Sequence, residues 1–424
     1  MKYLWYLAGS LDVQHAMLEA YDYYAFTLAA MGGHTGALRY LWNLADLPNA
    51  QREMLEADDY AAFIFTIDGD HIEALEYLWG VAEELQDVRR AMLKYDDYLA
   101  FRLAAGGGYI RILNFLWEKA ESPDEQRAML KSNNYLAFKM AVQKGHAKVL
   151  NFLWEKAESP DVQHTMLKVN DYSAFKFAAL YGHTEVLDFL WNKVELSEAQ
   201  CAILEADNYV MFRTSAQEGH IGVLNFLWKK AKSLNVRREM LEVSNYEVFG
   251  TASIRGNTKV LDLLWEKAGS LGVQCVMLQG SGYPAFAIAA YNGHIDVLGY
   301  LWNKAESLNV QSAVLGAKGY VAFKVAAESG HTDVLDYLWR KAKSLNVQST
   351  MLQVSGHVAF KVAAQKGHID VLNFLWKKAK AFRGAQRAML YQPSQITRQI
   401  IHRAKVFDRT FRNISNKFRY SIFE

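Results

Sequence analysis

The chain repeats one pattern of apolar and polar residues that predicts pairs of amphipathic helices. In one clear copy, the first apolar stripe consists of Tyr172, Phe175, Ala178 and Ala179. Asp171 precedes this stripe and is the expected N-cap, and Gly182 and His183 then interrupt the helical spacing. The second stripe consists of Val186, Leu187, Leu190 and Trp191. The pattern therefore predicts two consecutive helices, packed antiparallel.

A third segment, at residues 159–167, joins one helix pair to the next. Ser159 is a candidate N-cap, and Pro160 follows at the position where proline is favoured in the first helical turn. Met166 and Leu167 then supply apolar anchors. A short helix is expected here, and no strand, because β-branched alternation is absent.

Two ladders of aromatic residues show that this unit recurs along the chain. The tryptophans are Trp5, Trp42, Trp79, Trp117, Trp154, Trp191, Trp228, Trp265, Trp302, Trp339 and Trp376. They are 37 residues apart, except for one step of 38 between Trp79 and Trp117. The matching phenylalanines are Phe26, Phe63, Phe101, Phe138, Phe175, Phe212, Phe249, Phe286, Phe323 and Phe360. Self-similarity at a fixed period is the signature of a repeat protein.

The sequence motif of the helix pair resembles the two-helix core of an ankyrin repeat. The shared pattern is Ala-Phe-x-x-Ala-Ala-x-x-Gly-His-x-x-Val-Leu-x-x-Leu-Trp, with clear copies at 174–191, 285–302, 322–339 and 359–376. The unit is longer than the usual period of about 33 residues. In place of the usual Thr-Pro-Leu-His opening, the sequence has Ser173-Ala174-Phe175-Lys176. The Gly-Ala-Asp turn of the usual β-hairpin is also missing.

The resemblance implies an all-α, ankyrin-like solenoid of about ten stacked units, with a short extra helix in place of the β-hairpin. We expect an N-terminal half-repeat or cap at 1–22, ten repeats at 23–393, and a basic amphipathic helix or tail at 394–424. One unit cannot bury its own apolar face, so neighbours must stack. The Trp and Phe ladders are the expected core, where each ring stabilises the fold by about 3–5 kcal/mol.

Charge is distributed unevenly along the chain. The total is 47 Lys and Arg against 45 Asp and Glu, a net charge of +2. Residues 377–424 hold 12 of the basic and 2 of the acidic residues, which leaves 35 and 43 for residues 1–376. The body is therefore acidic (35 − 43 = −8) and the tail basic (12 − 2 = +10). No run of 18 apolar residues predicts a transmembrane helix.

The tail has one apolar helical stripe after Pro393. Its contact residues are predicted to be Phe407, Phe411, Ile414 and Phe418, with Arg403 beside them. Three interpretations stay open: a cap on the last repeat, a peripheral contact with anionic lipid, and a secretion or docking signal. Nucleic-acid binding is the weakest hypothesis, because the body is acidic and no recognition motif accompanies the tail.

Residue types that often carry chemistry occur here without a catalytic arrangement. Eight histidines lie eight residues before a tryptophan: His34, His71, His146, His183, His220, His294, His331 and His368. Neighbouring helices pack about 8–10 Å apart, whereas metal–nitrogen bonds are about 2 Å, so a structural role at the turn is expected. Cys201 and Cys275 are two repeats apart, too far for a disulfide, which suits a reducing compartment. No enzyme activity, cofactor or metal is predicted.

The remaining candidate is a surface for another protein. One face of the first helix carries the predicted partner-binding residues Leu99, Arg102, Leu136, Lys139, Ser173, Lys176, Val210, Arg213, Lys324 and Lys361. Alternating aliphatic and basic groups suit an acidic amphipathic segment of a partner. The competing interpretation is an ordinary solvated helix face. Charge reversal at Arg102, Lys139, Lys176 and Arg213 is expected to separate these interpretations by abolishing binding without unfolding.

Divergent arrays of this kind resemble those of intracellular bacteria and large DNA viruses, where they often act on host proteins. The resemblance implies a non-catalytic scaffold, located in the cytoplasm or, for a secreted effector, in the host cytoplasm. The alternative function is a membrane-associated adaptor that docks on anionic lipid through the basic tail.

Overall fold

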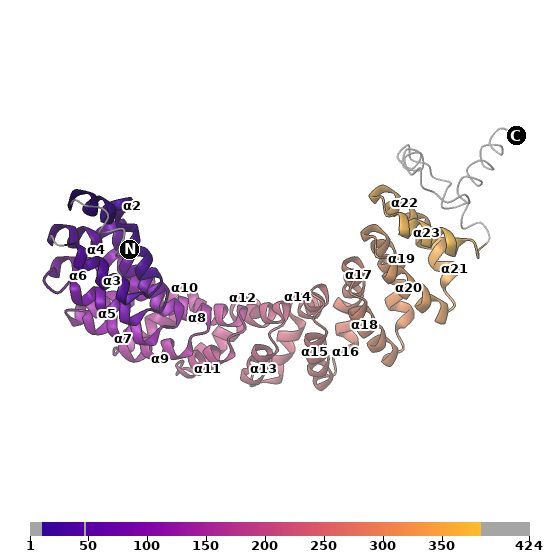
Figure 1. Cartoon of the computed structure of the whole chain (residues 1–424). Coiled ribbons are helices and arrows are strands. Elements are labelled where there is room, and N and C mark those ends of the chain that lie inside the picture. Colours follow the sequence, from indigo (N-terminus) through magenta and orange to yellow (C-terminus); the bar gives the residue numbers. More distant parts are fainter. Residues whose placement is uncertain (1–10, 46–47, 383–424) are drawn as a thin grey trace. The chain divides into compact units, whose positions relative to one another are not determined.

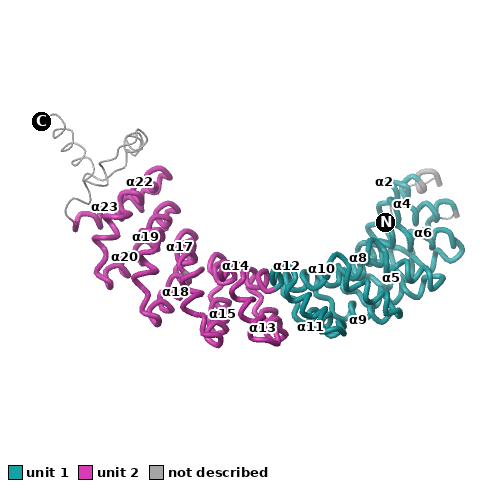
Figure 2. The backbone as a smooth tube through the Cα atoms, turned by 180° about the vertical axis from the view of Figure 1, so that it is seen from behind, with its two compact units in different colours: residues 1–211 teal, residues 212–424 magenta. Residues whose placement is uncertain are grey.

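The computed structural model describes residues 11–45 and 48–382, and this part of the chain is helical with no strand (Figure 1). The fold divides into two compact units, residues 1–211 and 212–424 (Figure 2). Each unit is described by itself below. The tail at 394–424 and its five predicted contact residues, Arg403, Phe407, Phe411, Ile414 and Phe418, lie outside the described residues.

The first unit is built from long helices that alternate with short ones. Its helices are α2 (Leu11–Met31), α3 (Thr35–Leu44), α4 (Pro48–Asp68), α5 (Ile72–Val81), α6 (Gln86–Gly107), α7 (Ile110–Lys119), α8 (Pro123–Lys144), α9 (Ala147–Lys156), α10 (Pro160–Leu180) and α11 (Thr184–Asn192). The boundary between the units falls inside α12 (Ser197–Glu218).

The second unit continues the alternation. Its helices are α13 (Ile221–Lys230), α14 (Leu234–Ile254), α15 (Thr258–Leu271), α16 (Gln274–Met277), α17 (Tyr283–Asn292), α18 (Ile295–Ser307), α19 (Gln311–Ser329), α20 (Thr332–Ser344), α21 (Gln348–Met351), α22 (His357–Lys366) and α23 (Ile369–Ala379). Two π-helical turns, η1 (Leu278–Gly282) and η2 (Leu352–Gly356), join α16 to α17 and α21 to α22.

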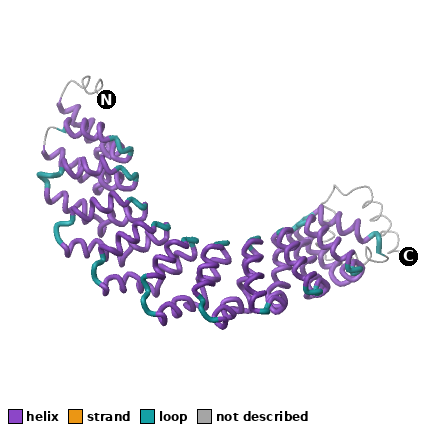
Figure 3. Tube along the Cα trace, turned by 90° about the horizontal axis from the view of Figure 1, so that it is seen from below, coloured by secondary structure: helices purple, strands orange, loops and turns teal. Residues whose placement is uncertain are grey.

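Each unit has two layers of helices. In the first unit, one layer consists of α2, α4, α6, α8 and α10, each in contact with the next. The other layer consists of the short helices, in which α3 contacts α5, α7 contacts α9 and α9 contacts α11. In the second, α14, α17, α19 and α22 form one series of contacts, and α13, α15, α18, α20 and α23 form the other. Figure 3 shows the helices joined by short loops. The predicted pairing of helices within and between repeats is thus confirmed.

Each long helix of the first unit is two helices separated by a left-handed turn. In α10, Val169 is extended (φ −48°, ψ 128°), and the next three residues, Asn170, Asp171 and Tyr172, have φ of 50°, 54° and 54°. We call residues 160–168 the linking helix and residues 173–180 the phenylalanine helix. The short helix that follows, here α11, is the tryptophan helix. The predicted extra helix is therefore present.

Two details of the sequence prediction are wrong. Asp171 is not an N-cap, because its backbone is in the left-handed turn rather than at the start of a helix. Ser159 precedes Pro160 as expected, but its side chain makes no capping hydrogen bond. The equivalent Ser122 and Ser233 do cap, accepting from the N–H groups three residues later.

The same turn occurs in eight repeats, and the two exceptions are η1 and η2. The turns with three consecutive positive φ values are residues 21–23, 58–60, 96–98, 133–135, 170–172, 207–209, 244–246 and 318–320. Seven of them have Asp or Asn at the central position, and these residues tolerate the left-handed conformation best after glycine. The two π-helical segments have Ser-Gly there instead.

The predicted aromatic core is confirmed over the described residues. Phe175 is fully buried and Trp191 is 5% exposed. Phe and Trp of one repeat lie against each other, with centroids 6.1 Å apart for Phe101 and Trp117. Trp117 also meets Phe152 of the next repeat edge-on at 6.2 Å, so the rings join consecutive repeats. Trp154 is the exception, because it is only partly buried.

Candidate functional site

The recurrent histidines hold neighbouring repeats together. Nε2 of His183 lies 2.9 Å from the backbone oxygen of Gln143, at the end of the preceding phenylalanine helix. Since a carbonyl can only accept, Nε2 donates. The other ring edge fits against Gly145, where a Cβ would lie 2.6 Å from Nδ1 of His183. Equivalent bonds link His71 to Met31, His146 to Gly106, His294 to Ile254 and His368 to Glu328.

Two repeats have another residue in place of the histidine, and both keep a bond to the preceding repeat. In one, the Asn257 amide donates to the backbone oxygen of Gln217 at 3.2 Å. In the other, the preceding turn has Asp70 in place of the glycine. That repeat carries Tyr109, whose hydroxyl donates instead to the backbone oxygen of Asp68 at 3.2 Å. These bonds are consistent with the structural role predicted for the histidines. The side chains bond to the preceding repeat, however, and do not cap their own helix.

Lysines two residues after five of the tryptophans form a second link between repeats, which the sequence analysis missed. Nζ of Lys193 lies 5.5 Å from the ring centroid of Trp154 in the preceding repeat and 5.3 Å from that of Phe189 in its own. The same double contact occurs at Lys156, Lys304, Lys341 and Lys378. Each cation–π contact contributes about 0.5–1 kcal/mol at an exposed site. The regular Trp-x-Lys spacing was the available signal.

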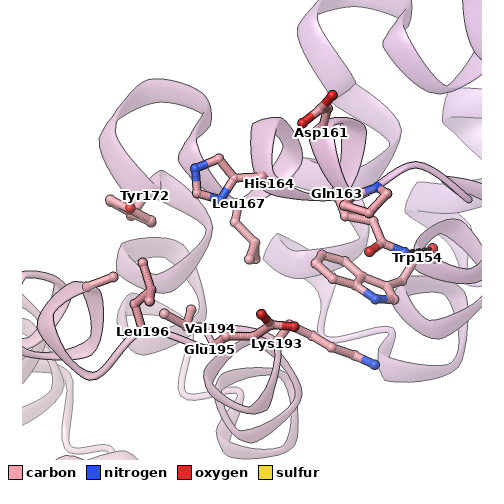
Figure 4. A pocket seen from close by; sticks show the side chains of 12 residues that line it. Trp154, Asp161, Gln163, His164, Leu167, Tyr172, Lys193, Val194, Glu195 and Leu196 are labelled. Carbon is pink, nitrogen blue, oxygen red and sulfur yellow. Dashed lines mark hydrogen bonds between the residues drawn. The ribbon is translucent and has the colours of Figure 1, made fainter.

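A cavity of about 310 Å³ lies beside Trp154 in the first unit (Figure 4). Trp154 and Gln163 lie at one end, and Tyr172 and Leu196 at the other. Smaller cavities lie at the equivalent places beside Trp117 and Trp79. The cavity lies between the linking helix of one repeat and the end of the next tryptophan helix. It has charged residues at its edge, such as Asp161 and Glu195, but no nucleophile paired with a base.

Four of the predicted partner-binding positions lie on consecutive helices of the first unit. Leu99, Leu136, Ser173 and Val210 are all partly exposed, at the same place on four consecutive phenylalanine helices. Because α6, α8 and α10 contact in order, the first three positions form one column. We call the column and its adjoining basic residues the phenylalanine-helix face.

Three of the six predicted basic positions, Arg102, Lys176 and Arg213, are already ion-paired. Arg102 is only 6% exposed, and its guanidinium lies 2.7 Å from the carboxylate of Asp96 in its own left-handed turn. Lys176 lies 3.2 Å from Asp171 and 2.6 Å from Asp207 of the next repeat. These side chains fold back onto the turns, where carboxylates offset the cost of burying a charge. Arg102 therefore does not lie on the solvent-exposed face.

The second unit shows the same trend less completely. Arg213 is partly exposed and lies 3.0 Å from Glu247. Lys324 is partly exposed and Lys361 is exposed, with no ion pair given by the described residues. The two cysteines, Cys201 and Cys275, are both free and exposed.

Comparison with known proteins adds no functional information to the fold. No protein-family model matches the chain, and no curated protein is similar to it. What the described residues define is an all-α protein of repeated helical units, linked by ring stacking, histidine–carbonyl bonds and lysine–aromatic contacts. No described helix has the length and apolar character needed to cross a membrane.

Proposed function

We propose that the chain is a divergent ankyrin-like solenoid that binds a segment of another protein on the phenylalanine-helix face and catalyses no reaction. The observation that carries the proposal is the column of Leu99, Leu136 and Ser173, which successive repeats present at the same helical position. A surface that repeats along a stack of helices suits an extended partner better than a small molecule, because each repeat adds an equivalent contact.

The host-directed role and the cytoplasmic location are part of the same proposal. They rest on the resemblance to ankyrin arrays of intracellular bacteria and large DNA viruses, and on the two exposed free thiols. The membrane-adaptor alternative depends on the tail, which lies outside the described residues, so no observation of the fold favours it.

Selection of a displayed library of random 16-residue peptides on the full chain tests the binding surface. The double variant Leu99→Ser/Leu136→Ser should weaken a selected peptide by about tenfold or more, because contacts at the centre of an interface dominate affinity. Leu196→Ser is the matched control, since Leu196 is 67% exposed and lies at the cavity instead. Fluorescence anisotropy gives the dissociation constants, and a thermal melt checks folding.

The opposite pattern would overturn the proposal. If every selected peptide loses affinity in Leu196→Ser and none in the double leucine variant, the partner surface is the cavity beside Trp154. Charge reversal at all four basic positions is a poorer test than the sequence alone suggested. It would break the ion pairs of Arg102 and Lys176 and so change stability as well as binding.

A further inference from the structure

Lys139 differs from Arg102 and Lys176, its neighbours on the phenylalanine-helix face, because it has no carboxylate partner among the described residues. It lies on α8, between Arg102 on α6 and Lys176 on α10. Both neighbours are paired, Arg102 with Asp96 and Lys176 with two aspartates. Lys139 is partly buried, and that burial lowers its pKa.

The sequence explains why this lysine is unpaired. Lys176 contacts an aspartate five residues before it and another 31 residues after it. The residues at these distances from Lys139 are Asn134 and Asn170. Both lie in left-handed turns of the same geometry as those around Lys176, with φ of 56° and 50°. The backbone around Lys139 is therefore the same as around Lys176, but amides replace both carboxylates.

The replacement changes the kind of group that this position can hold. An ammonium and an asparagine amide are both hydrogen-bond donors, and a carboxylate accepts from both. Asn134 and Asn170 are exposed. A partly buried cation without a counter-charge is less favourable than a paired one, so an anion that completes the site would form a charge-assisted hydrogen bond.

We propose that Lys139, with Asn134 and Asn170, binds an aspartate or glutamate side chain of the partner protein. Leu136 lies one helical turn before Lys139 on the same helix and offers an apolar contact beside it. The partner segment therefore carries an acidic residue next to an aliphatic or aromatic one. This inference rests on the proposed function and names the chemistry of its central contact.

The test uses a peptide selected on the full chain, and its counterpart with each acidic residue changed to the amide. Lys139→Gln should weaken the acidic peptide by about tenfold to a hundredfold, the range for a hydrogen bond to a charged group. It should weaken the amide counterpart less, because an amide oxygen accepts a weaker hydrogen bond from the ammonium than a carboxylate does. Lys144→Gln is the matched control, because it removes the same charge from the exposed end of the same helix.

A second variant tests the site without removing the lysine. Asn170→Asp reproduces the aspartate that pairs with Lys176 one repeat later, so it should occupy Lys139 and weaken the acidic peptide to a similar extent. Its melting temperature should be equal to or above that of the unmodified chain. This result separates loss of the site from loss of folding.

The outcomes separate the inference from the proposed function. A peptide that depends on Leu99 and Leu136 but binds equally to Lys139→Gln overturns the inference and leaves the function. Absence of any peptide that depends on the two leucines overturns both. If inorganic phosphate displaces the peptide while its acidic residues prove dispensable, the site takes a free anion, and the inference is again wrong.

Discussion

At the scale of single residues, the sequence shows which positions recur but not what they touch. The Gly-His pair was evident, and a structural role followed from its spacing. Its partner was not evident, because His183 reaches a backbone oxygen 40 residues earlier and fits against the glycine of another repeat. Only stacking brings these groups together. The change to Tyr109 in the repeat after Asp70 was the available signal for the contact, although Asn257 replaces a histidine after an unchanged glycine, Gly219.

Substitution of Gly145 tests this contact. Gly145→Ala should destabilise the first unit by about 1–2 kcal/mol for its left-handed backbone alone, since φ is 81°. A further cost should come from the imidazole of His183, 2.6 Å from the new Cβ. Urea denaturation gives the free energy of unfolding.

Gly367→Ala is the matched control for that experiment. Its φ is 79°, yet no described heavy atom lies within 4 Å of an added Cβ. It should therefore show the backbone cost without the clash. Equal losses for the two variants would mean that the histidine moves aside freely and does not depend on the glycine.

At the scale of elements, helices were predictable and their interruption was not. The apolar spacing predicted the linking, phenylalanine and tryptophan helices, because each buries one stripe. The three-residue left-handed turn has no apolar period of its own, so Asp171 was assigned to an N-cap. The signal was the Asp or Asn that precedes the recurrent tyrosine, which favours the left-handed region.

The central aspartate of the turn also links repeats. The carboxylate of Asp22 accepts from the backbone N–H of Asp58 at 3.0 Å, and that of Asp97 accepts from the N–H of Asn133. Asp97→Ala should therefore lower the free energy of unfolding by about 1–2 kcal/mol, through loss of the acceptor and of the left-handed preference. Chemical denaturation monitored by circular dichroism measures the change.

Asp97→Asn should lose less than half as much as Asp97→Ala. Asparagine keeps both the left-handed preference and a side-chain oxygen that accepts the same hydrogen bond. If alanine is tolerated as well as asparagine, the turn is imposed by the packing of the flanking helices and the aspartate contributes nothing to it.

At the scale of the whole molecule, the repeats predict the core of the fold but not the environment of the residues on the binding surface. The ladder of rings identified the core because every copy repeats it. The phenylalanine-helix face could be placed by helical spacing, but the ion pairs of Arg102 and Lys176 could not, because they depend on how side chains fold back onto the turns. Lys139 emerged only when the environments of equivalent residues were compared.

Two neighbouring tryptophans test how far the core depends on burial. Trp191 is 5% exposed, and Trp191→Ala should cost about 3–5 kcal/mol, as for other buried aromatic residues. Trp154 is partly exposed beside the 310 Å³ cavity, so Trp154→Ala should cost clearly less.

In a stack of repeats each unit is stabilised mainly by its neighbours. Hydrogen exchange should therefore lose protection first in α10 and α11, and α2 should stay protected. Equal losses for the two variants, or uniform loss of protection across the first unit, would contradict this dependence on the nearest repeats.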